Sequence, residues 1–462
     1  MKILLVNAAL RPDSMFFFPP MGLGYIATAI HNKGYEFDLF DIDVSRPSPE
    51  EIEKFFNGNK YDVVFMGCIV TGYQIVKKLI EPIKLNSPET TVVVGNTVAS
   101  SIPEHLLKYS DADIAVVGEG DETVIELLGL LESGQSLDGC KGIVYKCGDE
   151  IIRTSARPPI KSLDDVPFIN WNLFDIEKYI DNSKMAAEDS IPLDKKDVRL
   201  LPICSARGCV HKCTFCYHSF KDVPYRRRSN ENLIAEIESR MDEYGINVFY
   251  MQDDLTFFSK KNIAEFVAMV NDKNLRFYWR GTCCANLLDK DVDVELAKSM
   301  KKAGCVSMGF SLESADVAIL KAMNKHHKPE EFVRQAGIFH EAGIVPLTSL
   351  VVGYPQETEH SIRKTIDYCI EARVYPSIGF LLPQPGSKMF DYAVENGFIG
   401  DLEEYYMMLG DRQDLRLNMT EMSDDKLEQV VKQEMQRCNE VLGMGLDPDR
   451  LIKTGKYQKP KI

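Results

Sequence analysis

The sequence lacks any long hydrophobic run. Its most apolar stretch, residues 63–70, is far too short to span a bilayer. The opening residues, MKILLVNAALRPD, contain a short apolar run that Asn7 interrupts, and they show no signal-peptide cleavage pattern. We therefore expect a cytoplasmic protein with no membrane span, in which the 12 cysteines are reduced thiols rather than a disulfide framework.

The chain also lacks an excess of positive charge. It has 54 Lys and Arg against 69 Asp and Glu, a formal net charge of −15. Phosphates need cations, so we do not expect nucleic acid among the partners. No internal repeat or low-complexity tract is present. At 462 residues, with 45% hydrophobic and 27% charged residues, the composition is that of a globular protein with two or more domains.

Three cysteines stand close together in the stretch RGCVHKCTFCYH, residues 207–218. Cys209, Cys213 and Cys216 have the spacing C-x3-C-x2-C, and Phe215 directly precedes the last of them. Thiolates are the usual ligands of iron–sulfur clusters, which require four ligands. A loop that supplies three leaves one iron open to a small molecule, which is a catalytic arrangement.

A structural zinc site is the alternative, with Cys204 or His218 as the fourth ligand. Structural zinc usually has two ligand pairs that are separated by a dozen or more residues. No second pair follows at such a distance, because the next cysteines, Cys283 and Cys284, are adjacent and far away. The spacing therefore favours the iron–sulfur cluster.

The first part of the chain alternates apolar runs with helical patterns. The expected strands are residues 2–7, 37–41, 63–67, 91–95 and 114–118, and the expected helices are residues 22–33, 74–85, 103–109 and 122–132. This order predicts an α/β fold with a doubly wound, Rossmann-like parallel sheet that binds ligands at the carboxyl ends of its strands. The loops there are rich in Gly and Thr, so that the backbone can approach a bulky ligand. Their candidate residues are Thr71, Gly72, Gly95, Asn96, Thr97, Gly118 and Gly120. Alone, these loops fit a nucleotide, a flavin or a structural domain equally well.

Six strand–helix units follow. The expected strands are residues 200–205, 248–252, 276–282, 307–311, 345–352 and 375–382, and helices are expected at residues 230–245, 261–273, 292–303, 329–342 and 359–372. The pattern predicts a partial (β/α)6 TIM-type barrel with its chemistry at the carboxyl ends of the strands. Polar residues at those ends are Asp253, Asp254, Arg280, Ser311 and Glu313. An isolated carboxylate is more often a cap or loop residue, so their shared placement at one barrel mouth is what singles them out.

We expect four segments: a ligand-binding domain, an irregular proline-containing linker, the barrel, and a helical C-terminal extension with an acidic, Met-rich helix at 424–442. Their boundaries are 1–140, 141–198, 199–398 and 399–462. Cys283 and Cys284 are expected on opposite faces of a strand, where one can reach the cavity, although buried inert thiols are commoner. His326 and His327 are expected to face solvent.

The cysteine motif with its preceding aromatic resembles that of the radical S-adenosylmethionine (SAM) superfamily. The segments PPMGLGYIATAI, VVVGNTVAS and VVGEGDET resemble the cobalamin-binding domain that precedes many radical SAM enzymes, and RPPIKSLDDVPFINWNLFD resembles the interdomain segment. Other cobalamin domains carry an Asp-x-His-x-x-Gly loop whose histidine ligates cobalt. That loop is absent here, which implies a cobalt without a protein histidine.

The resemblance implies an enzyme similar to the class B radical SAM methyltransferases. Its cofactors would be a [4Fe–4S] cluster on Cys209, Cys213 and Cys216, with SAM and cobalamin. It also implies that Glu313 contacts the SAM ribose, that Asp253 or Asp254 contacts its amino group, and that Arg280 contacts its carboxylate. In this family a 5′-deoxyadenosyl radical removes hydrogen from an unactivated carbon of a small-molecule substrate, which is then methylated. An electron donor such as flavodoxin or ferredoxin is the implied partner.

Two alternatives stay open at this point. An enzyme of the same architecture can use cobalamin for ring formation, rearrangement or oxidation. A non-catalytic iron–sulfur protein, with the N-terminal domain as an interaction module, would show no SAM cleavage in the presence of reductant.

Overall fold

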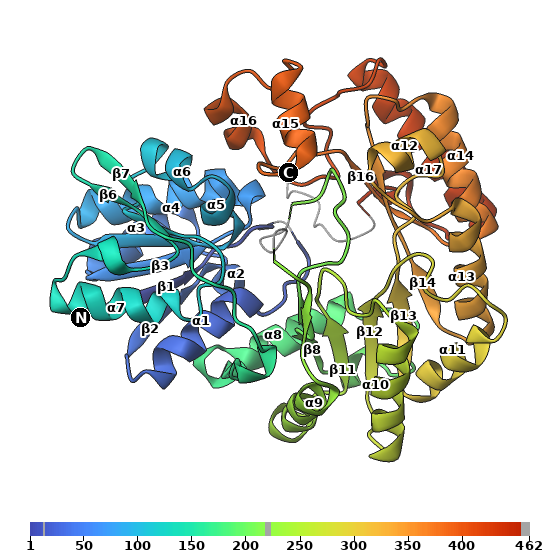
Figure 1. Cartoon of the computed structure of the whole chain (residues 1–462), viewed down its shortest axis with the longest axis horizontal. Helices are drawn as coiled ribbons and strands as arrows, with labels where there is room; N and C mark the ends of the chain where they lie inside the picture. The colour runs from blue at the N-terminus through green and yellow to red at the C-terminus, as the bar shows by residue number, and fades with distance from the viewer. Residues whose placement is uncertain (13, 218–222, 454–462) are drawn as a thin grey trace.

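The computed structural model describes residues 1–12, 14–217 and 223–453 (Figure 1). Two α/β parts lie side by side, with α15 and α16 at the top of the view between them and α17 beside α14 of the second part. Among the described residues, no helix has the length and apolar character needed to cross a bilayer. His218, the alternative zinc ligand, lies outside the described residues.

The N-terminal part is a sheet with the strand order β2-β1-β3-β4-β5-β6-β7, of which the first five strands are parallel. These five are β1 Ile3–Asn7, β2 Phe37–Asp41, β3 Val63–Gly67, β4 Thr91–Gly95 and β5 Ile114–Val116. The helices are α1 Met21–Asn32, α2 Ile42–Ser45, α3 Pro49–Gly58, α4 Tyr73–Asn86, α5 Asn96–Ser101, α6 Pro103–Tyr109 and α7 Thr123–Ser133. Successive strand residues face opposite sides of a sheet. Leu5 therefore packs with α1 and α7, whereas Leu4 packs with α4 and α6. The predicted doubly wound sheet is confirmed.

The segment expected as an irregular linker begins instead with a hairpin. Strands β6 (Ile143–Cys147) and β7 (Glu150–Arg153) add to the edge of the first sheet in antiparallel fashion. The two residues between them are Gly148, with φ of 60°, and Asp149, a pair that suits a tight hairpin turn. The first sheet therefore continues past residue 140. The same segment later forms helix α8, Ile176–Ser183.

The second part is a parallel sheet with the order β14-β13-β12-β11-β8, followed by the separate pair β15-β16. The strands are β8 Leu200–Ile203, β11 Val248–Met251, β12 Tyr278–Thr282, β13 Cys305–Gly309, β14 Val345–Leu347, β15 Ser349–Val352 and β16 Ser377–Phe380. The helices are α9 Asn230–Tyr244, α10 Lys260–Asp272, α11 Asp293–Lys302, α12 Val317–Ala322, α13 Pro329–Glu341 and α14 Glu359–Glu371. The strand expected at 345–352 is split at Thr348, whose hydroxyl accepts a hydrogen bond from the Leu312 amide at 3.0 Å. The predicted partial barrel is confirmed.

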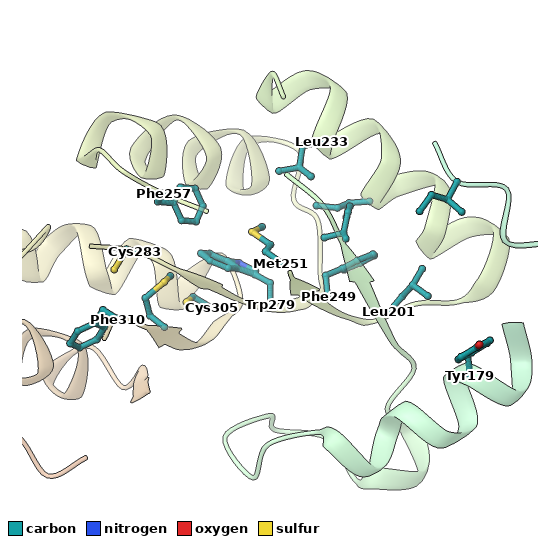
Figure 2. Packing of buried hydrophobic residues seen from close by; sticks show 14 of the residues in the cluster. Tyr179, Leu201, Leu233, Phe249, Met251, Phe257, Trp279, Cys283, Cys305 and Phe310 are labelled. Carbon is teal, nitrogen blue, oxygen red and sulfur yellow. The ribbon is translucent and has the colours of Figure 1, made fainter. Parts of the chain in front are cut away.

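The core of the second part lies between its strands and the surrounding helices (Figure 2). Phe249, Met251 and Trp279 are almost fully buried there. The Trp279 indole donates a hydrogen bond to the Ala303 carbonyl at 2.8 Å, which satisfies its polar atom inside the core. This packing fixes the strands whose carboxyl ends carry the candidate residues.

The C-terminal extension contacts both parts of the molecule. It contains α15 Lys388–Glu395, α16 Leu402–Met408 and α17 Asp424–Leu442, the last with the bounds expected from the sequence. Helix α17 packs on α14, with an ion pair of 2.7 Å between Arg437 and Asp367. Glu403 of α16 accepts a hydrogen bond from the Tyr73 hydroxyl at 2.7 Å and contacts His105 Nε2 at 2.7 Å, both in the N-terminal part.

Candidate functional site

A cavity of about 1340 Å³ lies between the two parts. Residues that follow the carboxyl ends of β1 and β2 line one side, and residues that follow β11, β12 and β13 line the other. The cavity also contains every candidate of the cysteine motif and the barrel: Cys209, Cys213, Phe215, Cys216, Asp253, Asp254, Arg280, Ser311 and Glu313. The structure thus brings these residues together around one space.

The cysteine loop is anchored at both its base and its middle. At its base, the short strands β9 (Ala206–Arg207) and β10 (Arg226–Arg227) pair with each other. In its middle, the Thr214 amide donates to the Met323 carbonyl at 3.1 Å, and Phe215 meets the ring of Tyr354 edge-on. Cys209 and Cys213 are half-buried and Cys216 is exposed. The loop therefore presents its thiols to the cavity from a fixed support.

The three thiols influence one another electrostatically. Burial raises the pKa of Cys209 and Cys213. Cys216 is exposed as a whole residue, but the protein atoms around its thiol, together with Cys213 and Asp254, raise its pKa to about 12. Metal-bound thiolates are deprotonated, so assembly of a metal centre here would release protons. In the described part of the chain, no group of three or more His, Cys, Asp or Glu residues could hold a metal ion. A multi-iron cluster needs a wider arrangement of thiols than one ion does.

Glu313 is buried in the loop that follows β13 and has a left-handed backbone, with φ of 61°. Its amide donates to the Ser349 carbonyl at 3.1 Å, which joins β13 to β15. Its carboxylate lies 3.2 Å from Lys325 Nζ. Burial lowers the pKa of Lys325, but Glu313 and Cys213 outweigh burial, so that the pKa is raised and the lysine is charged. Lys325 was not predicted as a site residue, because no motif in the sequence marks it.

The two aspartates after β11 differ in their surroundings. The carboxylate of Asp253 accepts hydrogen bonds from the amides of Ser205 and Ala206 at 2.8 and 3.0 Å, and from the Ser205 hydroxyl. Its oxygens therefore hold the backbone that leads into the cysteine loop. Asp254 is exposed to the cavity, and it raises the pKa of Cys209 and Cys216.

Arg280 is paired with a residue from the segment between the two parts. Its Nη1 donates to Glu188 Oε1 at 2.7 Å, and its guanidinium lies 3.7 Å from the centre of the Tyr250 ring. Both partners line the same cavity. Glu188 was not singled out in the sequence, because nothing in a linker distinguishes one acidic residue from another.

None of the seven small-loop candidates lines this cavity. Some serve the packing of their own loops: Thr97 accepts a hydrogen bond from the Val70 amide at 2.8 Å, and a Cβ on Gly72 would lie 2.2 Å from the Cys68 sulfur. Gly95 and Gly118 differ, because a Cβ on either would meet no atom closer than 4.0 Å. The Cβ positions of these two glycines, at and beyond the carboxyl ends of β4 and β5, are therefore open. The other three candidates, Thr71, Asn96 and Gly120, also lie outside the lining of this cavity.

The N-terminal side of the cavity is lined by residues that the sequence did not single out. They are Ala8, Leu10, Arg11, Ser14, Met15, Phe16, Phe17, Phe18, Pro20, Asp43 and Arg46. The Arg46 guanidinium pairs with Asp43 at 2.6 Å and lies over the ring of Phe17. In the sequence, only the length of the loop after the first strand indicated that this region could line a site.

The adjacent cysteines both line the cavity but differ in burial. Cys283 is buried among core residues (Figure 2), whereas Cys284 is half-buried with its Sγ 3.2 Å from His211 Nε2. Both follow β12 rather than lie within it. Burial, together with Cys209, raises the pKa of Cys284 to about 11, so this thiol is protonated.

The expectation for the two histidines was wrong for one of them. His326 is exposed and lines the cavity. His327 is buried, with its Nε2 3.1 Å from the Leu312 carbonyl, next to Glu313. Burial and the nearby charge of Lys325 lower the pKa of His327 to about 4, so the imidazole is neutral. It was misjudged because a polar loop sequence does not show which residue folds back beneath its neighbour.

Comparison with known families assigns both parts of the chain. Residues 203–369 match the radical SAM superfamily, and residues 13–128 match the B12 binding domain. The B12 binding match covers β2 to β5 of the first sheet, and the radical SAM match covers β11 to β15 of the second part. The presence of both domains in one chain implies a [4Fe–4S] cluster, SAM and cobalamin as cofactors.

Two relatives carry different activities. An uncharacterized methyltransferase of Pyrococcus horikoshii is 26% identical over 86% of this chain and 84% of its own length. The anaerobic magnesium-protoporphyrin IX monomethyl ester cyclase of Cereibacter sphaeroides is 24% identical over 75% of this chain and 56% of its own length. The chain therefore resembles methyltransferases and cyclases at similar levels of identity.

A solved structure shares the fold of both parts together. The radical SAM methyltransferase TsrM of Kitasatospora setae, with cobalamin and a [4Fe–4S] cluster bound, superposes with a TM-score of 0.67 at 18% identity, over 86% of this chain and 78% of that one. At this identity the likeness establishes the fold alone. With the two family matches, it leads to one conclusion: the chain is a cobalamin-dependent radical SAM enzyme, with a B12-binding domain ahead of a radical SAM domain.

Proposed function

We propose that this enzyme methylates an unactivated carbon of a small-molecule substrate. The observation that carries the proposal is the cavity between the two domains, which the cysteine loop lines from one side and the β1 and β2 ends line from the other. A substrate in this cavity would touch both domains at once. Holding a substrate beside two reactive groups is the main way in which a protein accelerates such chemistry.

The barrel residues are assigned to the cluster and to SAM. The cluster would be held by Cys209, Cys213 and Cys216. The charged pair of Glu313 and Lys325 fits SAM, which carries both hydroxyl groups and charges. Asp254 is favoured over Asp253 for the SAM amino group, because the carboxylate of Asp253 already accepts three hydrogen bonds from Ser205 and Ala206.

The remaining assignments follow the shape of the site. Arg280 would bind the SAM carboxylate by exchanging its bond to Glu188. Gly95 and Gly118 would border cobalamin, since their Cβ positions are open. Phe215 and the aromatic residues at 16–18 line the cavity and would exclude water from it.

When bound, the cluster and SAM supply a radical that removes a hydrogen atom, and cobalamin supplies the methyl group. The chain itself binds and orients these groups. Lys325 supplies a counter-charge to the Glu313 carboxylate inside the barrel, because a buried charge needs a nearby charge of opposite sign. An electron donor such as flavodoxin or ferredoxin would deliver electrons to the cluster.

A cyclase of the same architecture is the second candidate, and the relationship to the Cereibacter cyclase supports it. Methyl transfer is favoured because the Pyrococcus methyltransferase matches 84% of its own length, against 56% for that cyclase.

The test is an anaerobic incubation of the reconstituted protein with SAM, reductant and methylcobalamin, followed by mass analysis of the products of SAM. A methyltransferase should form both S-adenosylhomocysteine and 5′-deoxyadenosine. With the true substrate, 5′-deoxyadenosine without S-adenosylhomocysteine would favour the cyclase. The absence of both products would leave a non-catalytic iron–sulfur protein.

A further inference from the structure

The loop that carries the three cysteines is closed by a very short hairpin. Strands β9 and β10 form only two residue pairs, in which Arg226 lies opposite Arg207 and Arg227 lies opposite Ala206. The loop between these strands contains all three cysteines, so the hairpin determines where the loop begins and ends. A hairpin this small has little stability of its own in water.

The hairpin also places two like charges opposite each other. Arg207 and Arg226 form a directly opposed cross-strand pair, which is unfavourable for residues of the same charge. Only 11% of the Arg207 side chain and 10% of the Arg226 side chain are exposed. Water screens buried charges poorly, so the repulsion between these two guanidiniums needs a counter-charge.

A carboxylate from the B12-binding domain supplies that counter-charge. Glu119 Oε1 accepts from Arg207 Nη1 at 2.5 Å, and Glu119 Oε2 accepts from Arg226 Nη1 at 2.9 Å. Oε2 also accepts from the Ile160 amide at 2.8 Å, which ties in the segment between the domains. Asp121 adds two bonds of 3.1 Å to Arg207. Three separate segments therefore meet at the one buried carboxylate of Glu119.

We infer that Glu119 and Asp121 are positioning residues that make the geometry of the cysteine loop depend on the docking of the B12-binding domain. Glu119 neutralises both arginines of the hairpin when the loop after β5 is in place beside it. The cluster site is thereby fixed relative to the cobalamin domain, whichever reaction follows. This role differs from the ligand contact that the sequence predicted for Gly118 and Gly120 in the same loop.

The first test is Glu119→Gln, which keeps the shape of the side chain and removes its charge. The matched control is Glu104→Gln, which removes a more exposed ion pair with Arg153 inside the B12-binding domain. Three properties of the cofactor-loaded protein are measured. They are amide hydrogen exchange in residues 203–217, the magnetic interaction between the reduced cluster and Co(II) by pulsed electron paramagnetic resonance (EPR), and the 5′-deoxyadenosine formed per product.

Glu119→Gln should speed exchange in this segment and broaden the distribution of cluster–cobalt distances. It should also raise the 5′-deoxyadenosine formed per product by roughly tenfold or more, because misplaced reactants are penalised steeply. The control should match the wild type in all three measurements. Unchanged exchange would overturn the inference. Faster exchange with an unchanged magnetic interaction would also overturn it, because Glu119 would then only add stability.

The second test is a rescue. Adding Arg226→Gln to Glu119→Gln removes one of the two opposed guanidiniums, while Arg207 keeps its bonds to Asp121. The double variant should therefore exchange more slowly than Glu119→Gln alone and should regain part of the magnetic interaction. A double variant that is no better than Glu119→Gln would contradict the argument from repulsion.

Discussion

Lys325 Nζ lies 3.2 Å from Glu313 Oε1, inside the barrel and beside the cysteine loop. The pair joins two segments on the barrel side of the cavity, because Glu313 follows β13 and Lys325 follows α12. Both side chains are largely buried, so neither is well solvated without the other.

The first prediction concerns this pair. Lys325→Met leaves the Glu313 carboxylate buried without its cation, and the affinity for SAM should fall at least about tenfold. Equilibrium dialysis of the cluster-loaded variant with SAM measures the loss. Lys321→Met, on the exposed side of α12, is the control and should bind as the wild type does. Equal affinities for Lys325→Met and the wild type would show that the pair does not serve SAM.

The second prediction concerns the cluster. Replacing Cys209, Cys213 and Cys216 together with Ala should abolish the broad visible absorbance of the reconstituted protein and its bound iron and sulfide. Cys147→Ala removes an exposed thiol outside the cavity and should leave both at the wild-type level. Iron and sulfide retained by the triple variant would refute the assignment.

The third prediction separates the two uses of SAM. Cys213→Ala should eliminate 5′-deoxyadenosine, since no electron would then reach the SAM sulfonium. Gly95→Trp places an indole in the open space beside the end of β4, so it should remove S-adenosylhomocysteine and leave SAM cleavage largely intact. Quantification of both products by mass spectrometry checks the split. If Gly95→Trp lowered both products in parallel, the glycine would not border the corrin.

The fourth prediction concerns the cobalt. The sequence has no Asp-x-His-x-x-Gly loop, so the Co(II) form of the bound corrinoid should show no nitrogen splitting from a histidine ligand. The EPR spectrum of protein purified with cobalamin is the measurement. Clear axial nitrogen coupling, or failure to retain a corrinoid, would count against this prediction.

The fifth prediction concerns pH. Burial raises the pKa of Glu357 from 4.5 to about 7. Between these two pH values the carboxyl is protonated in the folded state and ionised in the unfolded state. This group's contribution to stability is complete below about pH 4.5 and is lost as the pH rises to about 7. Glu357→Gln should therefore stabilise the protein at pH 8 by at most about 3 kcal/mol, and have little effect at pH 4. Urea unfolding of the cofactor-free protein at both pH values tests this, and a variant that is less stable at pH 8 would contradict it.

Local patterns were enough to predict much of the fold. Alternating apolar runs and helical periods located the parallel strands of both sheets, and the cysteine spacing identified the loop that lines the cavity. The split of the expected strand at Thr348 could not be predicted, because it depends on a hydrogen bond from Leu312, which lies on a distant part of the chain. The β6–β7 hairpin was missed because the prolines that follow it suggested a linker.

Site residues were harder to predict where a role depends on a partner from another segment. Asp253 and Asp254 are neighbours with the same side chain, yet only the structure shows that Asp253 holds the backbone of Ser205. Lys325 has no motif, and its importance comes from the approach of Glu313. Such pairings arise from tertiary packing, which a single sequence does not record.

The placement of Glu119 and Glu403 has a consequence for how molecules enter and leave the enzyme. One carboxylate ties the B12-binding domain to the base of the cysteine loop, and the other ties it to the C-terminal extension. A hinge motion that swung the domains apart would have to break both sets of contacts at once. Substrate and product are therefore expected to pass through a portal between side chains, and the width of that portal would decide which molecules the enzyme admits.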